Sequence, residues 1–181
     1  MSDDLPRNPG EPLTTTVDMT RQGHAWNFGD RVGIESISPL RFMLDPAERA
    51  VRCLESLDPR FGPNVKPGDI LFAGKNFGHG PGHDHAILAL KETGMGGVVA
   101  HSFAPQFFRH AVDHGLLLAE YLHASSVASA GDIVVVDFAT GRLVNKTQGT
   151  SALVRVPQGP AFDILVCGGL IPYLRRELHA S

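Results

Sequence analysis

A glycine-rich segment, GKNFGHGPGHDH at residues 74–85, constrains the fold of this chain more than any other stretch. It follows an apolar run at residues 69–73 that is typical of a strand, and it precedes a run at residues 86–91 that favours a helix. The pattern therefore predicts a loop that joins a strand to the N-terminus of a helix. Gly74, Gly78, Gly80 and Gly82 permit positive φ and close backbone approach. Free backbone N–H groups and the helix dipole at such a loop favour an anion, for example a carboxylate or a phosphate.

Side chains of the same segment add positive charge and hydrogen-bond donors, namely Lys75, His79, His83 and His85. The segment is therefore a candidate site for a small acid, and a strand-to-helix turn without a ligand is the alternative interpretation. Its glycine spacing matches neither the dinucleotide-binding nor the P-loop motif. The histidines follow no recognised metal-binding pattern, so we predict no metal site.

Residues 74–118 resemble the signature region of the isopropylmalate dehydratase small subunit, the separate swivel domain of the aconitase superfamily. In that family the loop reads G-x-N-F-G-C-G-S-S-R-E-H-A, and a helix, a strand ending in S-F-A, a second helix and N-x-G-L follow it. The matching residues are Gly74, Asn76, Phe77, Gly78, Gly80, His85, Ala86, Ser102, Phe103, Ala104, Gly115 and Leu116. The resemblance implies an α/β fold of the aconitase swivel type, layered β/β/α, with strands covered by helices.

The core of the family's loop, Ser-Ser-Arg-Glu, is replaced here by Pro81, Gly82, His83 and Asp84. The resemblance implies that a serine acts as the catalytic base and that the arginine binds a substrate carboxylate. We predict that His83 replaces the arginine as a pH-dependent partner, and His83 and His79 are the candidate catalytic residues. Pro81 and Gly82 cannot carry a proton, so three outcomes stay open: a histidine is the base, a partner subunit supplies it, or dehydratase activity is lost.

The predicted substrate-binding residues come from the loop and from a segment that the family places over its site. Arg41 lies in that second segment, where it is a candidate for choosing the substrate's side chain. The complete predicted set is Lys75, Asn76, Gly80, Gly82, His85 and Arg41.

The resemblance also implies a partner and a reaction. The chain would be the small subunit of a hydro-lyase, closing over a large subunit that carries a [4Fe–4S] cluster and acts on a 2-hydroxy acid such as 3-isopropylmalate. This chain itself is predicted to bind no cofactor. One alternative is a hydro-lyase subunit for a different malate derivative, and another is a non-catalytic carboxylate-binding or regulatory subunit of the same fold.

Composition excludes several other classes of function. A net charge of −3 gives no electrostatic footprint for nucleic acid or for an anionic membrane. Cys53 and Cys167 are too few for a structural zinc or an iron–sulfur cluster and are expected to be reduced, as in a cytoplasmic protein. No apolar run is long enough to span a bilayer. We predict a flexible N-terminal arm at residues 1–24 and one swivel domain at residues 25–181.

Local patterns predict further elements along the chain. Asp45 followed by Pro46 predicts the start of a helix over residues 45–54. Residues 98–100 and 116–118 are predicted strands, and a helix ending before Gly115 lies between them. Residues 133–137 and 142–145 predict a β-hairpin, and residues 150–156 a further strand. Residues 162–174 resemble the C-terminal helix of the same family, so the resemblance implies a helix there.

Overall fold

The structure, a computed structural model, describes residues 16–42, 45–81 and 84–179. The described residues form a seven-stranded sheet in the order β4-β3-β2-β1-β5-β6-β7. β1, β2, β3 and β4 pair in parallel, whereas β5, β6 and β7 pair antiparallel with β1 and with one another. The strands are β1 (Thr20–Asn27), β2 (Ile70–Ala73), β3 (Gly97–Ala100), β4 (Leu118–Glu120), β5 (Ile133–Asp137), β6 (Arg142–Asn145) and β7 (Thr150–Leu153).

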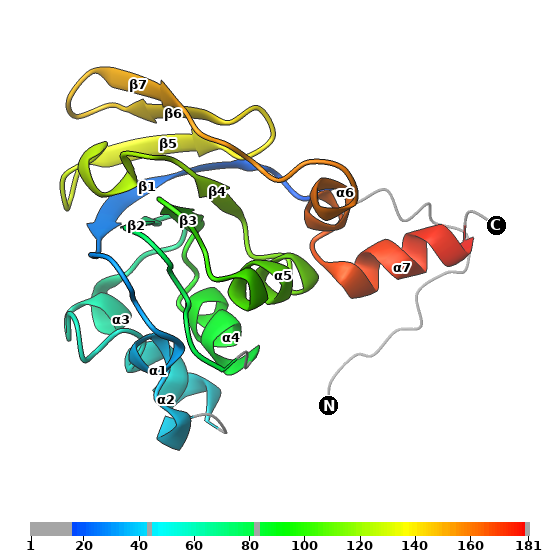
Figure 1. The fold of residues 1–181 in the computed structure, drawn as a ribbon, viewed down its shortest axis with the longest axis horizontal. Helices are drawn as coiled ribbons and strands as arrows, with labels where there is room; N and C mark the ends of the chain where they lie inside the picture. Colours follow the sequence, from blue (N-terminus) through cyan, green and yellow to red (C-terminus); the bar gives the residue numbers. More distant parts are fainter. Residues whose placement is uncertain (1–15, 43–44, 82–83, 180–181) are drawn as a thin grey trace, which may run out of the picture.

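The sheet curls until its two edges meet. Glu120, at the end of β4, and Arg155, just beyond β7, exchange backbone hydrogen bonds of 2.8 and 2.7 Å and form an isolated antiparallel bridge. Figure 1 shows β5, β6 and β7 on one side of the parallel strands and the helices α1 to α5 on the other. These three layers confirm the predicted α/β fold with strands covered by helices.

Helices follow most of the parallel strands and cover their outer face (Figure 1). β2 and β3 are buried along their whole length, as expected for parallel strands with both faces covered. The helical segments are α1 (Ile34–Ile37), η1 (Leu40–Phe42), α2 (Pro46–Val51), α3 (Phe61–Asn64), α4 (Asp84–Glu92), α5 (Pro105–Asp113), η2 (Ala124–Ser126), α6 (Pro160–Val166) and α7 (Leu170–His179).

Several local predictions are confirmed. The glycine-rich segment does join a strand, β2, to a helix, α4, and the hairpin strands β5 and β6 have the predicted bounds. Asp45 caps α2 by accepting hydrogen bonds from the N–H groups of Ala47 and Glu48, at 3.0 and 3.2 Å. Pro46 occupies the first helical turn, where its missing N–H costs nothing.

Several boundaries differ from the predictions. The predicted helix at residues 45–54 ends at Val51, and the predicted strand at residues 150–156 ends at Leu153. The structure places Thr20–Asn27 in β1, so the predicted arm cannot include residues 20–24. The predicted strand at residues 116–118 lies two residues later, as β4. The predicted C-terminal helix is divided into α6 and α7, because Gly168 and Gly169 take positive φ values of 86° and 128°, which a continuous helix does not allow.

No helix in these described ranges combines the length and the hydrophobicity that crossing a membrane requires.

Candidate functional site

The loop at residues 74–81 leaves the C-terminal end of β2, where ligand sites of parallel sheets commonly lie. Five consecutive backbone N–H groups of this loop donate hydrogen bonds within the fold, so they are already satisfied without a ligand. Their acceptors are Gly29 O for Gly74 (3.1 Å), Asp30 Oδ1 for Lys75 (2.7 Å), Ser102 Oγ for Asn76 (3.0 Å), Ser102 O for Phe77 (3.0 Å) and Val32 O for Gly78 (2.7 Å).

The turn after β1 interlocks with this loop. The N–H of Arg31 donates to Lys75 O at 2.7 Å, and the N–H of Ile34 donates to His79 O at 2.8 Å. The Nε2 atom of His79 lies 2.8 Å from the carbonyl oxygen of Arg31, which means that Nε2 carries the hydrogen of this bond. Ser102 follows β3, so one hydrogen-bond network joins the C-terminal ends of three parallel strands, β1, β2 and β3.

An aromatic cluster fixes the loop to α5. The ring of Phe77 is fully buried and packs edge-on against Phe103 and Phe107, with centroids 6.2 and 5.1 Å apart. Gly78 lies against the same cluster with a φ of +77°, and a Cβ added there would lie 2.2 Å from the Phe107 ring. The loop therefore has one buried side that fixes its position and one exposed side.

The exposed side carries three of the predicted substrate-binding residues, Lys75, Asn76 and Gly80, while His79 is half-buried. Asn76 and Arg31 both have a φ of +56°, although neither is a glycine. Backbone of this kind is strained for residues with a side chain, and such strain concentrates at functional sites. The sequence analysis did not single out Arg31, because it lies outside the glycine-rich segment, in the turn after β1.

Other predicted residues lie elsewhere. His85 is buried in α4, and its Nε2 lies 3.0 Å from Ser38 O, so the imidazole bridges α4 to the segment after α1. Arg41 is exposed in η1, and its guanidinium donates to Glu55 at 2.8 Å. Gly82 and His83 lie outside the described residues.

Asp84, the first residue of α4, has its own partners on α5. Its carboxylate accepts a hydrogen bond from Nδ1 of His110 and lies 3.4 Å from Nε2 of His114. The bond from His110 is the main cause that lowers the pKa of Asp84, partial burial opposes it, and the charge of His114 adds to it. Asp84 therefore links the start of α4 to α5.

The described part of the chain has no group of three or more His, Cys, Asp or Glu side chains arranged to hold a metal ion. Cys53 is fully buried, and burial raises the pKa of its thiol. Cys167 is partly exposed, and neither cysteine is in a disulfide.

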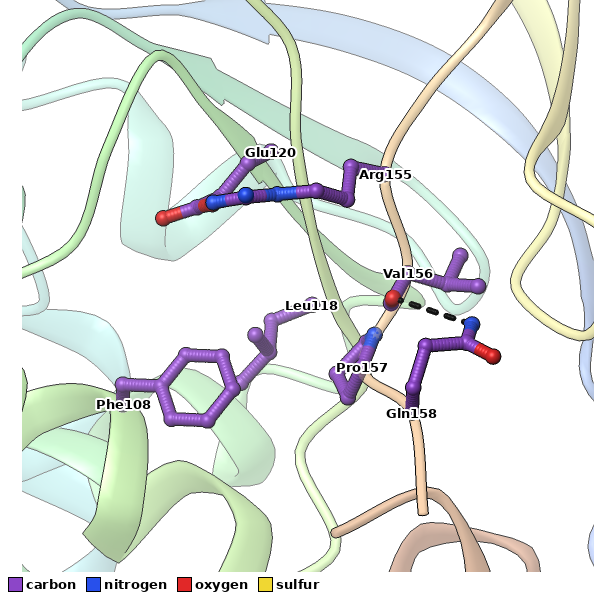
Figure 2. A pocket seen from close by; sticks show the side chains of 7 residues that line it. All are labelled: Phe108, Leu118, Glu120, Arg155, Val156, Pro157 and Gln158. Carbon is purple, nitrogen blue, oxygen red and sulfur yellow. Dashed lines mark hydrogen bonds and ion pairs between the residues drawn. The ribbon is translucent and has the colours of Figure 1, made fainter.

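Two cavities lie away from the loop. One, of about 250 Å³, is at the seam of the curled sheet; Figure 2 shows Phe108, Leu118 and Pro157 gathered below the Glu120–Arg155 ion pair. The other, of about 650 Å³, is a groove bordered by Trp26 and Lys66. Neither of these two cavities is lined by a residue of the loop at 74–81.

Comparisons with known proteins agree with this geometry. Residues 59–124 match the aconitase C-terminal domain family. A 3-isopropylmalate dehydratase small subunit from Moorella thermoacetica is 39% identical, over 90% of this chain and 99% of that protein. A 2,3-dimethylmalate dehydratase small subunit from Eubacterium barkeri is 38% identical, over 86% of this chain and 97% of that protein.

A similar solved structure is the crystal structure of 3-isopropylmalate dehydratase from Methanocaldococcus jannaschii. It matches with a TM-score of 0.84 and 34% identity, over 90% of this chain and 97% of that chain. The likeness therefore extends over 90% of the chain and is not confined to the glycine-rich segment.

Proposed function

The chain belongs to the family of 3-isopropylmalate dehydratase small subunits, and we propose that it closes over an iron–sulfur large subunit to dehydrate or isomerise a 2-hydroxy acid such as 3-isopropylmalate. The observation that carries the proposal is the match over nearly the full length of its relatives, with the same fold. The hydrogen bonds between the turn after β1 and the glycine-rich loop support the proposal. They leave one exposed rim, formed by Arg31, Lys75, Asn76 and Gly80, on which a second subunit can enclose a small acid.

The residue roles are part of the proposal. Lys75 supplies a permanent positive charge for a carboxylate, and its exposure on the rim supports that role. His79 holds Arg31 O with Nε2, which leaves Nδ1 as the atom that exchanges a proton. His83 is the proposed second catalytic group, and the proposed substrate contacts are Lys75, Asn76, Gly80, Gly82 and Arg41. The predicted contact His85 is buried in α4 against Ser38, which supports a structural role for it instead.

The cluster belongs to the large subunit in this proposal. A [4Fe–4S] cluster would act as a Lewis acid on the hydroxyl group of the substrate, and this chain's residues would bind and orient the carboxylates. The buried Cys53 thiol, with its raised pKa, does not fit a role as a cluster ligand. A cytoplasmic location is also proposed, in keeping with two cysteines that are not in a disulfide.

Co-expression with an iron–sulfur large subunit tests the function. The pair should turn over at least one 2-hydroxy diacid, with 3-isopropylmalate and 2,3-dimethylmalate as the first two substrates to assay. The isolated chain should fold, contain no stoichiometric iron or sulfide, and show no turnover.

The same assay separates the alternatives. Turnover of 2,3-dimethylmalate but not of 3-isopropylmalate would favour a hydro-lyase for another malate derivative, as the name of the Eubacterium barkeri relative suggests. Binding of diacids by a stable complex without turnover would favour a non-catalytic subunit, in keeping with Pro81 and Gly82 at the family's serine positions. No complex and no binding would contradict the proposal as a whole.

A further inference from the structure

Two exposed cationic residues, Arg31 and Lys75, lie in neighbouring loops at the C-terminal ends of β1 and β2. Arg31 follows β1 and Lys75 follows β2, both are exposed, and a backbone hydrogen bond of 2.7 Å from Arg31 N to Lys75 O joins the two turns. Neither side chain forms an ion pair with a carboxylate in residues 16–42, 45–81 and 84–179. The adjacent carboxylate of Asp30 instead accepts the backbone N–H of Lys75 at 2.7 Å.

The backbone of Arg31 is held unusually firmly for an exposed residue. Its N–H donates to Lys75 O and its C=O accepts from His79 Nε2, so both of its backbone polar groups bind the glycine-rich loop. Its φ of +56° is a conformation that residues with a side chain rarely adopt. These two hydrogen bonds fix the backbone of Arg31 relative to the glycine-rich loop, as would be required of an arginine that binds a ligand together with residues of that loop.

We propose that Arg31 binds a carboxylate of the substrate at this rim, with Lys75 as the second cation. The inference rests on the proposed function, because a 2-hydroxy diacid presents the carboxylates that the two cations would bind. A guanidinium binds a carboxylate through two parallel hydrogen bonds, which fixes orientation as well as charge. Pro81 has no N–H to donate, and the five N–H groups from Gly74 to Gly78 are already satisfied, so these six positions offer the ligand no free backbone donor and the two cationic side chains would supply the contact instead.

The test compares Arg31→Gln, Arg31→Lys and the control Arg109→Gln in the co-expressed complex. Arg109 is an exposed arginine of α5 without an ion pair among the described residues. The Gln variant at Arg31 should raise KM for the diacid by about 10- to 100-fold, the loss expected for a hydrogen-bonded charged contact. Arg31→Lys should fall between it and the wild type, because it keeps the charge but not the paired hydrogen bonds. Arg109→Gln should stay within twofold of the wild type.

A substrate analogue with one carboxylate converted to a neutral amide sharpens the comparison. If Arg31 binds that carboxylate, the wild type and Arg31→Gln should have equally high KM values for the amide. An unchanged KM in Arg31→Gln, or an equal loss in Arg109→Gln, would overturn the assignment.

A second measurement keeps the inference apart from the proposed function. If the complex turns over no diacid, the proposed function fails, and the full chain alone is then titrated with malate and followed by ¹H–¹⁵N spectra. The backbone amide signals of residue 31 and Lys75 should shift in the wild type, and those of Gln at position 31 and Lys75 should stay fixed in Arg31→Gln. Absence of these shifts in the wild type would overturn the carboxylate site itself.

Discussion

Replacement of Asp69 by Asn tests how a buried charge positions β2 and the loop that follows it. Asp69 immediately precedes β2, and its side chain is only 3% exposed. Oδ1 accepts from the His24 N–H at 2.8 Å, and Oδ2 accepts from Trp26 Nε1 and from the Lys66 N–H, each at 2.9 Å. Burial raises the pKa of this carboxyl, but the bonds from Trp26 and the two N–H groups outweigh it and lower the pKa overall.

The magnitude follows from the number of acceptors. Asparagine has the same shape, so the change leaves no cavity, but only one of its two terminal atoms can accept a hydrogen bond. At least one of the three bonds is lost, and a buried N–H then faces the amide's own donors. Each hydrogen bond to a charged group contributes about 1.5–3 kcal/mol, so we expect the free energy of unfolding to fall by about 3 kcal/mol at pH 7.

The assay uses the chain's single tryptophan, which is Trp26 itself. Denaturant unfolding followed by its fluorescence gives the free energy of unfolding of the wild type, Asp69→Asn and the control Asp163→Asn, an exposed carboxylate of α6. Because the folded pKa of Asp69 is lowered, its stabilisation is present above the unfolded pKa of about 3.9 and is lost as pH falls through the folded value. A loss below about 0.5 kcal/mol at pH 7, or a difference that persists undiminished at pH 2, would refute the reasoning.

Two further predictions concern the loop and its attachment to α5. Gly78→Ala should lower the free energy of unfolding by at least about 3 kcal/mol, because its Cβ would meet the Phe107 ring at 2.2 Å and the φ is +77°. The control Gly131→Ala, with a φ of +86° and no atom within 4 Å of the added Cβ, should cost only the backbone strain of about 1–2 kcal/mol. Equal losses of stability in the two variants would contradict the packing argument. Asp84→Asn should lower the free energy of unfolding by less than about 1 kcal/mol at pH 7, since the Asp84 side chain is 54% exposed. Its lowered pKa makes that contribution vanish as pH falls below about 4, so a loss that is equally large at pH 3 would show that charge is not the cause.

The sequence was sufficient for elements whose signal is local. The apolar run before Gly74 and the paired runs around Gly141 each specify their own structure, because their side chains are buried within a few residues of one another. β1 gave no such signal. Its residues include Arg21, Gln22 and Gly23, and it is a strand because β5, more than a hundred residues later in the chain, pairs with it.

The position of the glycine-rich loop was predictable from the sequence, but its hydrogen bonds were not. Glycine spacing located the loop correctly at the end of β2. It did not show that the N–H groups of Lys75 and Asn76 are bound by Asp30 and Ser102, because these partners come from the turns after two other strands. The same distance in sequence concealed Arg31, whose strained backbone is defined only by contact with Lys75 and His79.

The position of β1 in the sheet has a consequence for how the chain is made. Of the strands that the structure describes, the one synthesised earliest is the central one, with β2 on one side and β5 on the other. Its second neighbour exists only after synthesis has passed Asp137, and the seam at Arg155 closes later still. Until then one edge of β1 is an open template for pairing with other chains. Long-range pairing of this kind slows folding, so expression yield should depend on chaperones during synthesis more strongly than on the stability of the finished fold.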